Sequence, residues 1–284
     1  MESGEHIRRL SLSGGSFWLV GRAFIKKDFL EDTSYRLAFA IDLVGAFLEI
    51  ALFYFIAALI GKSTDNYFVM ESYGYFSFLL VGIAFTKFTN STMRSFAHKI
   101  EDYQVTGTLE AMLSTPTSIY RILFSSVLWQ HLYVTIIMVV YFLIGIAFFG
   151  LTVGNANWLS VCCVLFLTVT SFSSLGILAA SFIMLYKRGD PVLWLFGIVS
   201  SVLGGVYFPV KILPQWLQYI SDYIPITYIL KAMRKGLFEG ATLTEIAPQV
   251  VALLLFSLIL MPLGLMSFNH SVRKAKDAGT LSHF

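Results

Sequence analysis

Long apolar runs, most of them able to cross a lipid bilayer as a helix, dominate this sequence. A helix needs about 20 apolar residues to span the hydrocarbon core, and the clearest run extends from about Leu37 to Ile60. Five more follow, at about Tyr73 to Ala97, Ile119 to Gly150, Trp158 to Tyr186, Pro191 to Val206 and Ile246 to Phe268. Of these, Pro191 to Val206 is too short to cross alone. We therefore predict an all-α integral membrane protein with six transmembrane helices.

The composition supports a membrane setting. Hydrophobic residues make up 57% of the chain and charged residues only 13%, whereas about a quarter of the residues of a soluble domain are charged. So few charges cannot cover a water-soluble particle of 284 residues. The net charge is only +3, and the positively charged residues lie near the ends of the predicted spans. We expect membrane lipids around the chain and no nucleic-acid partner.

The placement of Lys and Arg predicts the topology. Most of these residues lie before the first span, in the second and fourth connections and in the C-terminal tail. The opposite side has five, namely Lys62, Lys211, Lys231, Arg234 and Lys235. Cytoplasmic loops carry an excess of Lys and Arg. We therefore expect a multi-pass protein of the cytoplasmic (inner) membrane with both termini in the cytoplasm.

The chain divides into three parts. Residues 1–36 form a cytoplasmic N-terminal segment, in which 16–36 mix aromatic and charged side chains. This mixture is typical of an amphipathic helix at the cytoplasmic leaflet, the alternative being a loosely helical leader. Residues 37–270 form the transmembrane domain, and 271–284 form a cytoplasmic tail. Four small residues in the fourth span predict close approach of neighbouring helices, namely Gly176, Ala179, Ala180 and Ser181.

The stretch before the last span is apolar but repeatedly interrupted by proline. Pro209, Pro214 and Pro225 separate short aromatic segments. Irregular backbone cannot face lipid, so we expect 207–240 to be an external, re-entrant group of short, protein-buried helices, the alternative being a plain external loop. We interpret its aromatic residues as an exit gate, against plain packing: Tyr207, Phe208 and Pro209, followed by Trp216, Tyr219 and Tyr223.

The connection between the second and third spans, about residues 98–118, is polar and predicted to be cytoplasmic. Local preferences favour a helix from about Tyr103 to Leu113, which Pro116 stops.

Three charged residues fall within the predicted spans, where charge is costly and frequently functional. Glu49 lies about 12 residues into the first span, and Lys87 about 10 residues from the cytoplasmic end of the second. At about 1.5 Å per residue the two lie at similar depth, so we predict that they pair. The alternative is that each faces water or a second subunit. Asp42 lies on nearly the same helical face as Glu49. We expect His131 to hydrogen-bond between helices.

No catalytic or metal site is expected. Gly61-Lys62-Ser63 resembles the end of a P-loop, but Ile56 stands where that motif requires its first glycine. His131 has no companions at metal-ligand spacing.

Two stretches resemble motifs of ABC-2 type permeases. Gly107 to Pro116, GTLEAMLSTP, is similar to the family's GTLE-x-LL-x-TP stretch. Phe208 to Leu217, FPVKILPQWL, followed by Pro225-Ile226-Thr227-Tyr228, is similar to its FP-x-x-x-LP-x-W-L and P-x-T-Y segment. The likeness extends over nearly the whole chain from about residue 16.

This resemblance implies six spans, an amphipathic helix before the first and a re-entrant pair before the last. It implies a homodimer working with two ABC ATPase subunits, which bind ATP and Mg, while this chain binds no cofactor. The loop at 98–118 would contact the ATPase through a coupling helix, the alternative being an ordinary solvated loop. The residues assigned to that contact are Glu101, Gly107, Thr108, Glu110, Thr115 and Pro116.

The resulting hypothesis is the permease of an ABC exporter without an ATPase site of its own. Its amphiphilic substrate would be a lipid-linked polysaccharide or glycolipid, or a hydrophobic drug. The alternatives are a membrane-embedded lipid-modifying enzyme and a non-transporting membrane scaffold.

Overall fold

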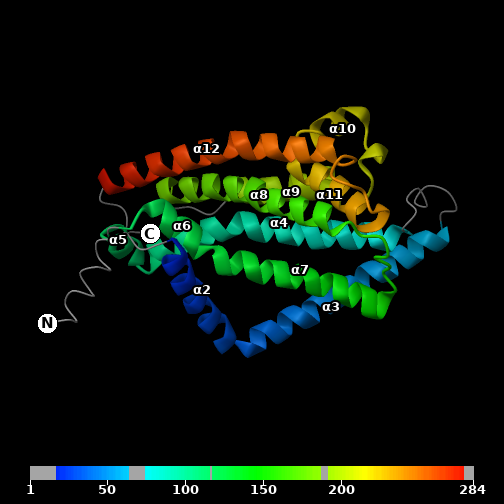
Figure 1. Ribbon diagram of the computed structural model, residues 1–284, viewed down its shortest axis with the longest axis horizontal. Coiled ribbons are helices and arrows are strands. Elements are labelled where there is room, and N and C mark those ends of the chain that lie inside the picture. Colours follow the sequence, from blue (N-terminus) through cyan, green and yellow to red (C-terminus); the bar gives the residue numbers. More distant parts are fainter. Residues whose placement is uncertain (1–16, 64–73, 116, 187–190, 278–284) are drawn as a thin grey trace.

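The computed structural model describes residues 17–63, 74–115, 117–186 and 191–277, which form helices with no strand among them (Figure 1). The longer helices are α2 (Phe17–Ser34), α3 (Arg36–Ser63), α4 (Gly74–Val105), α7 (Leu128–Phe149), α8 (Trp158–Tyr186), α9 (Pro191–Leu203) and α12 (Ala247–Asp277). The shorter ones are α5 (Thr108–Leu113), α6 (Ile119–Ser126), η1 (Val210–Ile212), α10 (Gln215–Ser221), α11 (Pro225–Arg234) and the π-helix η2 (Lys235–Glu239).

Four helical segments of the described chain are long and apolar enough to cross a membrane. They are Arg36–Ile60 in α3, Ile119–Phe149 in α6 and α7, α8, and α12. The helix α4 has 32 residues, but its second half is polar and charged, and the apolar part of α9 covers only Leu193–Leu203. The count of six spans therefore stays a prediction for α4 and α9.

The helices α4, α7, α8 and α12 pack side by side as a bundle (Figure 1). Small residues allow the closest contacts. A Cβ atom on Gly176 of α8 would stand 2.5 Å from the backbone oxygen of Met93 in α4. One on Gly264 of α12 would stand 3.0 Å from the backbone oxygen of Ser174 in α8. Ala179 is also buried. The close approach predicted for the fourth span is confirmed.

The helices α2 and α3 form a V-shaped arm on one side of this bundle (Figure 1). The helix predicted before the first span is present as α2, which packs on α6 and α7. Only 17% of the apolar window of α3 is buried. The arm therefore leaves most of its apolar surface for lipid or for another protein chain.

At one end of the bundle, here named the α5 end, lie α5, α6 and the last turns of α12 (Figure 1). The single helix predicted from Tyr103 to Leu113 is wrong, because α4 ends at Val105 and α5 begins at Thr108. Gly107 between them has φ +68°, a left-handed conformation that interrupts the helix and suits glycine. Pro116 lies outside the described residues, and α5 ends at Leu113 before it.

At the opposite end, here named the α11 end, the three prolines divide the chain into short helices (Figure 1). Pro209 precedes η1, Pro214 precedes α10, and Pro225 is the first residue of α11. A proline fits the first helical turn because that turn needs no backbone donor there. The helix α11 is largely buried, whereas α10 is mostly exposed. The re-entrant placement of this group stays a prediction.

Candidate functional site

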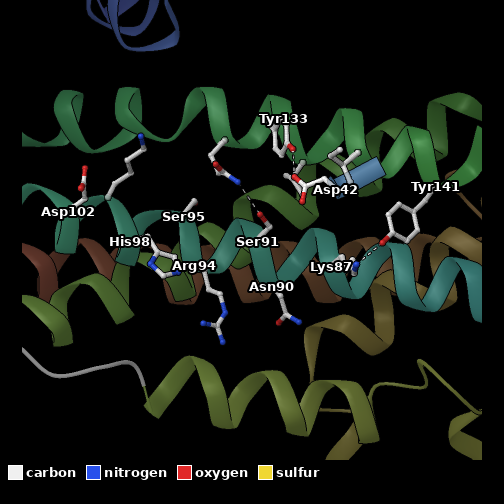
Figure 2. A pocket seen from close by; sticks show the side chains of 14 residues that line it. Asp42, Lys87, Asn90, Ser91, Arg94, Ser95, His98, Asp102, Tyr133 and Tyr141 are labelled. Atoms are coloured by element: carbon white, nitrogen blue, oxygen red, sulfur yellow. Dashed lines mark hydrogen bonds between the residues drawn. The ribbon is translucent and has the colours of Figure 1, made fainter. Parts of the chain in front are cut away.

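An ion pair between α3 and α4 lies at the centre of the arm's contact with the bundle. Glu49 and Lys87 are in direct contact, which confirms the predicted pairing. The hydroxyl of Tyr141 in α7 donates to Glu49 Oε2 at 2.7 Å. The same hydroxyl accepts from Lys87 Nζ at 2.6 Å (Figure 2). Tyr141 is only 2% exposed. Three helices therefore meet at one charged triad.

Other acidic residues of the arm are held in the same way. Asp28 Oδ2 accepts from Lys99 Nζ at 2.9 Å, and Asp32 Oδ2 accepts from the indole of Trp129 at 2.5 Å. The predicted intramembrane charge Asp42 accepts from the hydroxyl of Tyr133 at 2.6 Å.

Sequence reasoning missed the aromatic donors of this contact. Trp129 and Tyr133 are four residues apart and Tyr133 and Tyr141 eight, which places them on one face of a helix. A stripe of hydrogen-bonding aromatics within an apolar helix was the available signal. The arm is thus attached to the bundle by polar bonds as well as by packing.

A polar cavity of about 640 Å³ lies along α4 and α7 beside this contact (Figure 2). Its α4 wall carries Asn90, Ser91, Arg94, His98 and Asp102. These positions recur at three- and four-residue intervals, so they form a polar stripe on one face of the helix. Such a stripe on a helix that packs among apolar neighbours gives a polar solute a place to bind within the bundle.

Arg94 and Asn90 also line a second cavity of about 320 Å³, whose other wall is α9. Figure 2 shows both side chains directed away from α7 and toward α9. The α9 wall is largely apolar and includes Trp194, Ile198 and Val202. Arg94 forms no ion pair with any described residue. A cation thus stands between a polar cavity and an apolar groove, an arrangement that suits an amphiphilic molecule.

The described residues among those predicted for ATPase coupling lie together at the α5 end. In α5, Leu109 is buried against α4 and α6, whereas Thr108 and Glu110 are exposed. Gly107 and Thr115 flank this helix and are exposed as well. A buried anchor and an exposed polar face are what a docking helix requires.

Glu101 precedes this helix near the end of α4. Its carboxylate lies 3.7 Å from the ring of His98. Burial raises the pKa of the neighbouring Tyr103 phenol above its usual range, and that ring packs in the same cluster as Leu109. The base of α5 is therefore a packed apolar layer, and Glu101 lies on its solvated side.

The predicted exit-gate residues do not behave as one group. Tyr207 lies against α3, with its ring stacked on that of Phe53 at 6.0 Å between centroids. Its carbonyl also accepts a hydrogen bond from Tyr75. In contrast, Trp216, Tyr219 and Tyr223 are 63–80% exposed. Phe208 and Pro209 lie between Tyr207 and η1. The gating role stays a prediction.

His131 joins two helices, as expected from the sequence. Its Nδ1 lies 2.7 Å from the carbonyl of Val127, four residues earlier in the chain. Its Nε2 lies 3.3 Å from the hydroxyl of Ser173 in α8. The hydrogen bond to Ser173 confirms the predicted helix–helix contact.

The apolar helices fit a multi-pass membrane protein, and comparison with known proteins defines its family. The sequence profile of the ABC-2 type transporter family matches residues 20–238. This match covers well over half of the chain, so the protein belongs to that family. The chain is also similar to Linearmycin resistance permease protein LnrN of Bacillus subtilis (strain 168), with 24% identity over 138 residues. The similarity covers 45% of this chain and 36% of that relative.

Proposed function

We propose that the chain is the membrane subunit of an ABC exporter, which it forms as a homodimer with two copies of a separate ATPase. The ATPase binds ATP and Mg, and the permease moves an amphiphilic substrate outward. Six helices span the cytoplasmic (inner) membrane, with α4 and α9 as the second and fifth. Both termini are cytoplasmic, and the group from η1 to η2 re-enters the membrane from outside.

The continuity of α4 carries this proposal. One helix contains Lys87 of the triad, the polar stripe of the cavity and, in its last turn, the side chains on which α5 packs. A helix is stiff over this length, so a displacement applied at α5 reaches the cavity wall through α4 itself. The anchor is Leu109, and the exposed side chain available to a partner is Glu110.

The transport cycle follows from this connection. ATP-driven closure of the two ATPase subunits pushes on α5, and α4 changes its position against the arm and α9. Substrate moves outward only if the two states bind it with different affinity. Breaking the triad of Glu49, Lys87 and Tyr141 provides such a difference in affinity. Lys87 and Tyr141 line the cavity, and they lose their contacts with Glu49 when α3 and α4 separate.

The cavity supports an amphiphilic substrate. Its polar wall on α4 and α7 suits a head group, and the apolar α9 wall next to Arg94 suits a hydrocarbon portion. This leaves two substrate classes, lipid-linked polysaccharides or glycolipids and hydrophobic drugs. The name of the similar Bacillus protein, a resistance permease, favours the second class.

Co-purification from the native host tests the proposal. The tagged full-length chain is extracted in mild detergent, its partners are identified by mass spectrometry, and vanadate-sensitive ATP hydrolysis is assayed. We expect a stoichiometric P-loop ATPase, lost when Glu101→Gln and Glu110→Gln are combined. Glu239→Gln, an exposed carboxylate at the α11 end, is the matched control and should retain it. A stable chain with no ATPase and no ATP turnover would refute the proposal and favour a scaffold or a lipid-modifying enzyme.

A further inference from the structure

A third cavity, of about 850 Å³, lies at the α11 end and shares no lining residue with the two described above. It is enclosed by α11, η1, η2 and the turn after α9. Its lining includes four cationic side chains and one carboxylate, namely Lys211, Lys231, Arg234, Lys235 and Asp222. The volume lies within the range of small-molecule sites, and its charge is predominantly positive.

This positive charge stands where a membrane protein normally has little. On the predicted topology the α11 end faces outward, and Lys and Arg are depleted in outward segments. Five such residues fall on that side of the sequence, and four of them line this one cavity. Cations near the C-terminus of α11 also favour its helix dipole. That effect does not explain Lys211, which belongs to η1.

The cationic side chains have different roles. Arg234 is 6% exposed and donates to the carbonyls of Phe78 and Gly205, each at 3.0 Å. It thereby ties α11 to α4 and to the end of α9, and it positions the cavity wall. Lys231 makes only a long contact with Asp222, at 3.8 Å, and both side chains are about half exposed. Such a pair contributes little to stability, so an incoming anion can replace Asp222.

A buried side-chain oxygen adds a second observation. Gln249 lines the cavity, and its side-chain oxygen is buried without a hydrogen-bond partner among the described residues. Buried polar atoms normally have a hydrogen-bond partner. Because a carboxamide can present either its oxygen or its NH₂ group, Gln249 can serve an oxygen-rich ligand. The π-helix η2, which begins at Lys235, is a type of irregularity frequent at functional sites.

We propose that this cavity binds the anionic, phosphate-bearing head group of an amphiphile at the outer side of the membrane. Lys231 and Lys235 make charge-assisted contacts with the phosphate oxygens, and the neighbouring membrane takes the hydrocarbon portion. The inference rests on the proposed transport function and deepens it by naming the chemical class of the cargo. Of the two substrate classes left open above, the cavity selects the lipid-linked one, against the class that the name of the similar Bacillus permease favours. Arg94, a cation without an ion pair among the described residues at the other site, fits the same head-group charge.

Binding to the purified full-length chain in detergent tests this assignment. The probe is dihexanoyl phosphatidylglycerol, compared with dihexanoyl phosphatidylcholine and with inorganic phosphate by titration calorimetry. We expect the anionic lipid to bind about tenfold more tightly than the other two, and Lys231→Gln with Lys235→Gln to remove about that factor. The matched control combines Lys274→Gln and Lys276→Gln, two exposed lysines at the α5 end, and should bind as the unmodified chain does.

Three results would overturn the inference. They are equal affinity for the two lipids, undiminished binding by the Lys231 and Lys235 variant, and equally tight binding of inorganic phosphate, which would assign the cavity to free phosphate. Failure of the co-purification experiment would instead refute the transport function. The two failures are distinguishable because this titration needs no ATPase.

Discussion

Replacing Tyr141 by Phe tests the charged triad directly. The change removes one hydroxyl and keeps a ring that is 2% exposed, so packing is preserved. Two hydrogen bonds with charged groups are lost, each contributing about 1.5–3 kcal/mol. Glu49 and Lys87 still contact each other, and their side chains are 27% and 49% exposed, so water replaces part of the loss. We expect a net destabilisation of about 2 kcal/mol.

Thermal unfolding of the purified chain in detergent measures this loss. One kcal/mol lowers the Tm of a domain of comparable size by about 2–4 °C, so Tyr141→Phe should lower the Tm by about 4–8 °C. Tyr219→Phe, on a side chain that is 63% exposed, is the control and should leave it unchanged. In a Glu49→Gln background the effect of Tyr141→Phe should shrink, because its charged acceptor is gone. An unchanged Tm in the Tyr141 variant, or full additivity with Glu49→Gln, would refute the triad.

Three further predictions concern the arm, the bundle and the turn before the last helix. Lys99→Ala removes the lysine at 2.9 Å from the buried Asp28 carboxylate and leaves only the longer contact with Lys27 at 3.6 Å, so it should destabilise the chain by about 3 kcal/mol. Lys99→Arg should retain most of the stability that Lys99→Ala loses, as measured in the same unfolding assay. Gly176→Ala places a methyl group 2.5 Å from the α4 backbone and should cost about 1–3 kcal/mol, whereas Gly45→Ala meets nothing within 4 Å and should not lower the Tm. Hydrogen bonds from the backbone N–H and the hydroxyl of Thr242 lower the pKa of Glu245 below its usual value of about 4.5. The stabilisation that the ionised Glu245 carboxylate provides is therefore complete above the unfolded-state pKa of about 4.5. It is lost as the pH falls through the lower pKa of the folded state. The Tm difference between the unmodified chain and Glu245→Gln should narrow in acid, and a constant difference would contradict this.

The long apolar helices could be predicted from the sequence because hydrophobic length alone decides them. The first predicted span, Leu37 to Ile60, differs from α3 by only a few residues. The pairing of Glu49 with Lys87 was also predictable, because helical rise fixes the depth of each residue. The hydrogen bonds of Tyr141 with this pair were not predictable, since they depend on how α7 is rotated against α3 and α4.

Local interruptions were harder to predict. Gly107 lay inside the helix expected from Tyr103 to Leu113, and an isolated glycine is tolerated in a helix. Its left-handed conformation turns the chain so that Leu109 packs against α4, a contact between elements that sequence periodicity does not contain. Arg234 was counted only as an external charge, although it is buried and bonded to two carbonyls. Its role depends on contacts between segments far apart in the chain.

Site-specific photo-crosslinking tests the central claim, that a separate ATPase acts on this chain through α5. A photoactivatable residue is placed at Glu110, on the exposed face of α5, and separately at Trp216, which is 64% exposed at the α11 end. The tagged chain is irradiated in the native host, and crosslinked proteins are identified by mass spectrometry. We expect a P-loop ATPase attached at position 110 and not at position 216. An ATPase captured at position 216 and absent from position 110 would contradict the account.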